Sequence, residues 1–334
     1  MPPSYDGALD GASAQDVARL LRRLAAGVGA PTASAPGGER PLELTPLDAD
    51  PPRLEAAIPI EGGALAAQRV PGEPTVGFSA FLDGVQVSRV VGRWNDGVPI
   101  VHGIVAAVVR CRRDGELTTW RAPRVDRSVY LPASLAGDER VAALVDANIP
   151  VIDTLDGDAA HGARHPAELL AVARTAVQRR RELLETGLAE SWVAHGDGPL
   201  YVDGGIASSG TASRSDAAVG IVKSHRTLYA AGDALGVVLA LGEGERTSAF
   251  EIRSPRRTVV ASWYLRLRGA AGMDPFFGLV RVEVARASFV PARADEVSRW
   301  VLAERAPVSL PDKRWSTMAY GIRNCEEYLR AITG

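Results

Sequence analysis

Phe78-Ser-Ala-Phe-Leu-Asp83-Gly84 and Pro199-Leu-Tyr-Val-Asp203-Gly204-Gly205 share one pattern, a short apolar run that ends in an aspartate followed by glycine. An apolar run of this length is typical of a strand buried on both faces of a sheet. A carboxylate at the end of such a strand leaves the sheet where the backbone turns. Two such carboxylates, far apart in the sequence, can jointly bind a divalent metal ion if their strands are neighbours.

Asp-Gly is also a strong signal for a hairpin turn, because Gly tolerates positive φ and Asp hydrogen-bonds its own backbone. The pair recurs along the chain, for example at residues 96–97 and 114–115. Only the strand context distinguishes Asp83 and Asp203 from these other pairs. One alternative therefore stays open: an α/β protein that does not act on nucleic acid and in which every Asp-Gly pair is a turn.

Composition excludes several classes of protein. The 334 residues have a formal net charge of −2, with 46% hydrophobic and 23% charged residues, which gives no global basic field for nucleic acid. Two cysteines provide neither a disulfide framework nor a zinc quartet. The sequence has no apolar run long enough for a membrane span and no signal-peptide pattern, so we expect a cytoplasmic protein that does not contact membranes.

The pattern along the chain predicts two parts. Residues 1–54 form an N-terminal helix, at 14–28, and a linker rich in Pro and Gly, and residues 55–334 form one α/β domain. Strands at 76–83, 86–94 and 98–111, with turns at Asp83-Gly84 and 95–97, form an antiparallel meander. We expect helices at 165–193, 293–305 and 317–332, and further strands at 149–155, 199–203, 217–223, 247–252, 258–268 and 278–286.

A meander followed by alternating helices and strands is the layout of a ribonuclease H-like mixed sheet with flanking helices. Strands one and four are neighbours in that fold, so Asp83 and Asp203 are expected to approach each other. Hard carboxylate oxygens are the ligands that Mg²⁺ or Mn²⁺ prefers. The helix before the second strand offers Glu182, Glu185 and Glu190 as a third acid, and the spacing does not choose between Glu182 and Glu185. Either glutamate could also be a solvated salt-bridge partner.

Lys223 ends the apolar strand Val219-Gly-Ile-Val-Lys and is followed by Ser224, His225 and Arg226. A cation at this strand end can hold a phosphate or the attacking water, and His225 and Arg226 add positive charge beside it. The alternative is an edge-strand lysine that discourages aggregation.

Taken in order, these pieces resemble the NurA nuclease family. The matching segments span roughly residues 75–332 and comprise Asp83-Gly84, the Arg-rich helix with its glutamates, Asp203-Gly204, Gly220-Ile-Val-Lys223-Ser224, the strands at 262–267 and 280–284, and the C-terminal helix. The resemblance implies a ribonuclease H-like core and a Mn²⁺- (or Mg²⁺-) dependent DNA nuclease. Such a phosphodiester hydrolase acts as exonuclease and single-strand endonuclease, and is a dimer that works with a HerA-like hexameric ATPase that translocates DNA.

By the same resemblance, Asp83 and Asp203 bind the metal, Glu185 (or Glu182) is the helix acid, and Lys223 contacts the scissile phosphate or positions water. The chain departs from the family at two places. Val85 and Gly205 stand where the family often has Ser, and the segment 315–324 has no histidine, although Tyr320 can substitute for the family's aromatic residue. These departures fit a specialised relative in phage defence rather than general DNA end processing. They also leave open a DNA-binding or scaffold subunit that has kept the fold and lost the chemistry.

Overall fold

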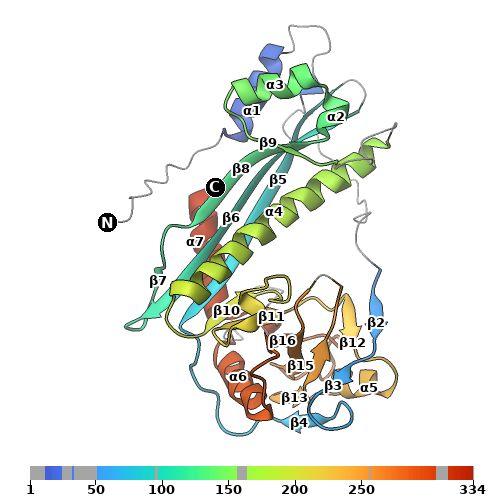
Figure 1. The fold of residues 1–334 in the computed structure, drawn as a ribbon, viewed down its shortest axis with the longest axis vertical. Helices are drawn as coiled ribbons and strands as arrows, with labels where there is room; N and C mark the ends of the chain where they lie inside the picture. Colours follow the sequence, from blue (N-terminus) through green and yellow to red (C-terminus); the bar gives the residue numbers. More distant parts are fainter. Residues whose placement is uncertain are drawn as a thin grey trace.

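A single mixed sheet organises the computed structural model, which describes residues 12–24, 32–33, 51–94, 97–155, 164–255, 257–305 and 315–333. Its strands follow the order β3-β14-β15-β16-β11-β10-β5-β6-β8-β9. Figure 1 shows the long strands β5, β6 and β8 extending upward from a more compact part that contains β10 to β16. The centre of this order, β8-β6-β5-β10-β11, positions the site.

Three long antiparallel strands form the meander: β5 (Ala80–Arg93), β6 (Pro99–Arg113) and β8 (Arg124–Leu131). The short β7 (Glu116–Thr119) pairs with β6, and β9 (Val151–Asp153) lies parallel to β8. The prediction of a turn at Asp83-Gly84 is wrong, because β5 runs straight through this pair, opposite Val108 and Ala107 of β6. The third strand of the meander is accordingly β8, and the two strands predicted at 76–83 and 86–94 are one.

The crossover from the meander to β10 (Leu200–Asp203) is made by the long helix α4 (Pro166–His195). β10 lies parallel to β5 and to β11 (Ala218–Val222), and β16 (Leu279–Ala285) pairs with β11 in the antiparallel direction. An antiparallel meander whose first strand has the parallel fourth strand beside it, with the fifth strand parallel to the fourth on its far side, is the ribonuclease H-like arrangement. The predicted fold class is therefore confirmed.

The lower part of the sheet completes the core. The predicted strand at 247–252 is two strands, because residues 248–249 separate β13 (Glu245–Thr247) from β14 (Phe250–Ile252), and both pair with β15 (Val260–Arg266). Helix α6 (Pro291–Ala303) packs against β15, where Trp263 Nε1 donates to Ser298 Oγ, and lies to the left of these strands in Figure 1. The remaining elements here are β2 (Arg53–Glu55), β3 (Ile58–Pro59), β4 (Ala67–Arg69), the 3₁₀ turn η2 (Ala212–Arg214), β12 (Thr227–Tyr229) and α5 (Asp233–Leu239).

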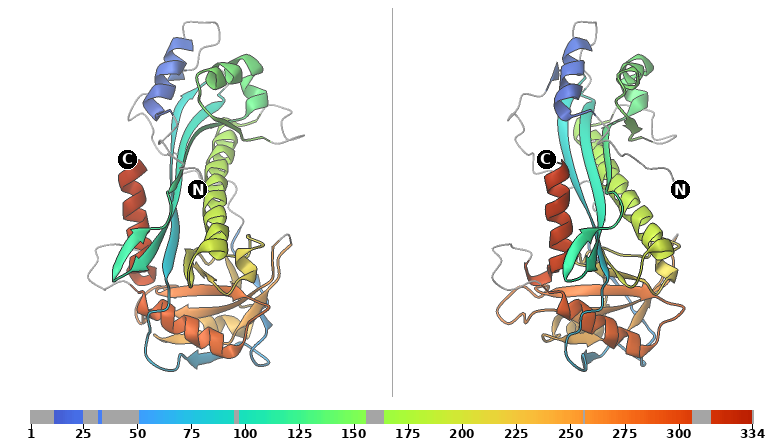
Figure 2. Two further views of the ribbon diagram at one scale, coloured as in Figure 1. Left: turned by 60° about the vertical axis from the view of Figure 1, so that its left-hand side comes forward. Right: turned by 90° about the vertical axis from the view of Figure 1, so that its left-hand side faces the viewer.

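Two helices cover opposite faces of the long strands (Figure 2). α4 begins at Pro166, where a missing N–H costs nothing, and the His165 ring accepts the N–H of Ala167 as its cap. The buried side chains of α4 face the sheet, whereas Leu183 is 61% exposed; those buried are Leu169, Ala173, Val177, Leu188, Ala189 and Trp192. On the other face α7 (Tyr320–Thr333), which follows the turn η3 (Trp315–Thr317), packs Gly321 against the Phe81 ring.

The upper end of the sheet has its own apolar cluster. Helix α1 (Ala14–Leu24) buries Val17 and Leu21 beside Val91 and Trp94, and β1 (Thr32–Ala33) pairs with the end of β5. Helices α2 (Ala133–Ala136) and α3 (Asp138–Asp146) complete this end. Most of the predicted linker and the predicted last turn of the N-terminal helix, residues 25–28, lie outside the described residues, and the division at residue 54 stays a prediction. Among the described residues, none of the helices is both long and apolar enough to cross a membrane.

Candidate active site

Asp83 and Asp203 lie at the same level of two neighbouring parallel strands. Leu82 of β5 is paired with Val202 of β10, and the two aspartates are the next residues on each strand. β10 ends at Asp203, as predicted, because Gly204 takes φ 132°, which disfavours any residue with a side chain. Both aspartates line one cavity of about 660 Å³, and Asp83 is only 5% exposed there.

Glu185 joins the two aspartates from α4. The helix crosses β5 at Gly84, where an added Cβ would collide with the Glu185 carboxylate. The Gly84 N–H is donated to Asp83 Oδ1 at 2.7 Å, so this glycine both contacts one acid and makes room for another. The lack of a side chain at Gly84 therefore allows the Glu185 side chain of α4 to approach β5 closely.

The carboxylates affect one another electrostatically. Burial raises the pKa of Asp83 well above its usual range, and the nearby charges of Asp203 and Glu185 raise it further, while Lys223 opposes them. Burial raises the pKa of Glu185 to about 7, against the opposing effect of Arg181 and with smaller contributions from Asp203 and Glu182. The cavity thus concentrates negative charge from β5, β10 and α4, which a cation stabilises.

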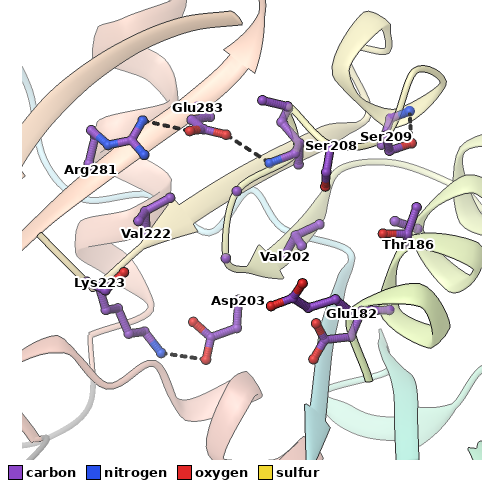
Figure 3. A pocket seen from close by; sticks show the side chains of 18 of the residues that line it. Glu182, Thr186, Val202, Asp203, Ser208, Ser209, Val222, Lys223, Arg281 and Glu283 are labelled. Atoms are coloured by element: carbon purple, nitrogen blue, oxygen red, sulfur yellow. Dashed lines mark hydrogen bonds and ion pairs between the residues drawn. The ribbon is translucent and has the colours of Figure 1, made fainter. Parts of the chain in front are cut away.

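Two basic side chains meet these acids. Lys223 Nζ, at the end of β11, donates to Asp203 Oδ2 at 2.9 Å (Figure 3). Arg181, one turn before Glu185 on α4, donates to Glu185 Oε1 at 2.5 Å. Glu182 also lines the cavity and accepts a hydrogen bond from Gln178, so α4 presents both candidate glutamates to the same space.

From the sequence, β16 was predicted only as a strand, yet two of its charged side chains, Arg281 and Glu283, line the cavity. Arg281 and Glu283, two residues apart on one face of β16, are joined at 2.6 Å, and Glu283 also accepts the N–H of Ile206 at 2.9 Å (Figure 3). The sequence signal that could have identified this pair is two opposite charges at alternate positions of an otherwise apolar strand. Arg257 and Tyr229 complete this side of the cavity.

The structure does not bring every predicted residue to the cavity. Arg226 lines it, but His225 is turned away, with Nε2 donating to the Leu279 carbonyl and the ring stacked on Phe276. Tyr320 is 60% exposed at the start of α7 and is not among the cavity residues. The C-terminal segment therefore adds no side chain to this cavity among its described residues.

The acidic cavity offers carboxylate oxygens to a divalent cation. Within the described ranges, no three His, Cys, Asp or Glu side chains converge as ready-made metal ligands. In this structure Lys223 pairs with the Asp203 carboxylate and Arg181 pairs with that of Glu185. The chemistry nevertheless fits, because Asp83, Asp203 and Glu185 supply hard oxygen ligands whose mutual repulsion a Mg²⁺- or Mn²⁺-like ion relieves.

The strand order and this cavity define the chain as a ribonuclease H-like α/β protein with acidic residues on neighbouring strands one and four. No protein-family model matches the chain. No curated protein matches it either. Among solved structures it is similar to the NurA nuclease from Sulfolobus solfataricus, at 12% sequence identity and a TM-score of 0.48, over 79% of this chain and 81% of that one. The strand pairings, and not this similarity, define the fold.

Proposed function

We propose that this protein is a metal-dependent DNA nuclease whose active site is the cavity around Asp83 and Asp203. One observation supports this most: acids from β5, β10 and α4 line one cavity, where burial raises the pKa of Asp83 and of Glu185 and the nearby charge of Asp203 raises both further. A protein retains such a cluster at a cost in stability, and strongly perturbed groups in a cleft are typical of functional sites.

In this proposal Asp83, Asp203 and Glu185 hold one or more Mn²⁺ (or Mg²⁺) ions. When bound, the metal lowers the pKa of a water molecule and offsets negative charge on the phosphate oxygens. Lys223, which already donates to Asp203, holds the scissile phosphate or orients the water. Glu182 is the alternative helix acid, because it faces the same cavity.

The cavity wall suits a phosphodiester substrate. Lys223, Arg226, Arg257 and Arg281 bring positive charge to a chain whose net charge is −2. Phosphate contacts of this kind supply most of the affinity of proteins for nucleic acid and do not depend on sequence. A local basic rim around an acidic centre therefore compensates for the missing global basic field.

The finer assignments follow the resemblance drawn from the sequence motifs. They are exonuclease and single-strand endonuclease activity, a homodimer, a HerA-like hexameric translocase as partner, and a role in DNA end processing or phage defence in the cytoplasm. Each is part of the proposal, and the partner is tested by an assay with the purified translocase.

The direct test is a cleavage assay on single-stranded and end-bearing DNA, with and without Mn²⁺, for the wild type and the variants Asp83→Asn and Asp203→Asn. We expect Mn²⁺-dependent cleavage by the wild type and at least about 100-fold loss in either variant, because each removes a metal ligand and loss of even an indirect partner of a metal site costs about 10–100-fold. Glu190→Gln is the matched control, because Glu190, the third glutamate that the helix offers, is not among the residues that line the cavity and accepts from Ser209 Oγ at 2.8 Å. Wild-type protein that is inert on every form of DNA, alone and with a translocase, would refute the proposal.

A second function is favoured by the position of the C-terminal segment. Tyr320, the substitute for the family's aromatic residue, is not among the cavity residues, and residues 315–324 contain no histidine. A DNA-binding or scaffold subunit with weak or no chemistry accounts for both facts. Salt-sensitive DNA binding without metal-dependent cleavage is its signature.

A further inference from the structure

A second, smaller hollow of about 520 Å³ adjoins the acidic cavity and has different chemistry. Its walls are mainly apolar, from Leu54, Leu228 and Phe276, and Arg53, Lys223 and Arg226 stand at it as well. We call this space the side slot. Leu54 is 56% exposed and Phe276 is 39% exposed, which is unusual for large apolar side chains that lie so close together.

The side slot and the acidic cavity are separated by a single strand. Thr227 and Tyr229 of β12 line the acidic cavity, whereas Leu228 between them lines the side slot, as the alternation of a strand requires. β2 pairs with β12 in parallel and sets Leu54 opposite Leu228. Lys223 and Arg226 line both spaces, so a ligand that leaves the acidic cavity around this strand passes these two cations.

Contacts with Arg266 and His225 fix the position of Phe276 in the wall of the side slot. The buried Arg266 donates to the carbonyls of Pro275 and Phe277, at 2.8 and 2.6 Å, on either side of Phe276. The Phe276 ring lies nearly parallel to His225, with centroids 5.3 Å apart and 21° between the planes. His225 is in turn fixed by its hydrogen bond to the Leu279 carbonyl. A rigid, partly exposed aromatic ring is a stacking platform that loses little entropy on binding.

We propose that the side slot binds one unpaired base of the DNA strand whose backbone lies in the acidic cavity, by stacking on Phe276. This rests on the proposed nuclease function. An unpaired base has an apolar face for Phe276 and the two leucines, and its phosphate has Lys223, Arg226 and Arg53 beside it. A base inside a duplex cannot enter, because its faces are already stacked. The side slot thus makes single-stranded DNA, or a frayed end, the preferred substrate.

The first test measures binding of a fluorescent oligothymidylate in the presence of a metal chelator, where no cleavage occurs. Phe276→Ala should weaken binding about tenfold, which is the usual effect of losing one base-stacking contact. Phe276→Tyr keeps the ring and should restore wild-type affinity. Met273→Ala is the matched control, because Met273 is 52% exposed on the same loop and does not line the side slot. Equal affinities for the wild type and Phe276→Ala would overturn the proposal.

A second measurement identifies the bound group as a base. Single abasic positions are moved along the oligonucleotide, and one of them should weaken binding to the wild type but not to Phe276→Ala. If abasic strands bind the wild type as tightly as intact ones at every position, the side slot takes something other than a base, such as an apolar side chain of a protein partner, and the proposal fails.

The two proposals fail in different ways. Wild-type protein that shows the abasic penalty yet never cleaves DNA with Mn²⁺ would refute the nuclease while supporting the side slot. Wild-type protein that cleaves single strands, with Phe276→Ala equal to it in binding, would refute the side slot while supporting the nuclease.

Discussion

Gly84 shows how one residue decides the shape of the candidate site. Its sequence context, after an aspartate, is that of a turn, but the structure uses it inside a strand as the point where Glu185 approaches the sheet. The same glycine donates its N–H to Asp83. The geometry of the site therefore depends on the absence of a side chain at Gly84 as much as on the acids themselves.

Gly84→Ala should therefore displace the Glu185 carboxylate while the strand pairing survives. A shift of about 1 Å in a catalytic group typically costs on the order of 100-fold in rate, so cleavage should fall by about this factor. Gly210→Ala is the control, since an added Cβ there meets nothing within 4 Å. Single-turnover cleavage assays compare the two variants, and wild-type rates for Gly84→Ala would contradict the role given to this glycine.

Glu185 makes stability depend on pH. Its pKa rises from 4.5 to about 7 on folding, so between these values the unfolded chain releases its proton while the folded chain keeps it. The folded state is then favoured at low pH, and this contribution, up to about 3 kcal/mol, is lost as the pH rises from 4.5 to 7. Urea unfolding of chelator-treated protein should show this loss in the wild type and a flatter profile in Glu185→Gln. Parallel profiles for the two proteins would contradict the assignment.

At the scale of elements, β16 fixes the loop that follows β10. Glu283 reaches across to the N–H of Ile206, and Arg281 braces Glu283 on the same strand. The Glu283 side chain is only 4% exposed. If it is removed, water therefore cannot easily replace it as the acceptor for Ile206 and Arg281. This contact keeps the chain close to the sheet directly after Asp203.

Glu283→Ala should consequently lower the free energy of unfolding by about 3 kcal/mol, the usual cost of breaking a buried charged pair. Glu283→Gln, which keeps an acceptor for Ile206, should lose less. Chemical denaturation measures both variants, and identical stabilities for Glu283→Ala and the wild type would show that the loop does not depend on this contact.

The elements predicted from the sequence show what local pattern can and cannot determine. The apolar run before Asp203 and the long helix that precedes it were recognisable because burial and helical periodicity act locally. The continuity of β5 was not, since Asp83-Gly84 has the local chemistry of a turn and only pairing with Val108 and Ala107 of β6 keeps it extended. The packing of Glu185 against Gly84 was equally hidden, because Glu182 and Glu185 both line the cavity and the sequence does not show which one lies against the strand.

At the scale of the whole molecule, the strand order assembles the site from segments far apart in the sequence. β5, α4, β10 and β11 each supply one group, namely Asp83, Glu185, Asp203 and Lys223. That the first strand lies beside the strand after the crossover was predictable, because few topologies join such elements without crossing connections. The meander itself was predicted only in part, since its first two predicted strands are both part of β5, and β8 lies in none of the predicted strands. The charged wall from β16 and the side slot beside β12 were not predictable, since they arise where the lower part of the sheet folds against the ribonuclease H-like centre.

The central claim is that Asp83 and Asp203 hold a divalent metal together. Anomalous diffraction from crystals soaked in Mn²⁺ measures this directly, at the manganese absorption edge. The account predicts an anomalous peak between the Asp83 and Asp203 carboxylates, within about 2.5 Å of an oxygen of each, and no such peak in Asp83→Asn crystals treated in the same way. Manganese bound only elsewhere on the protein, with the space between the two aspartates empty at saturating Mn²⁺, would contradict it.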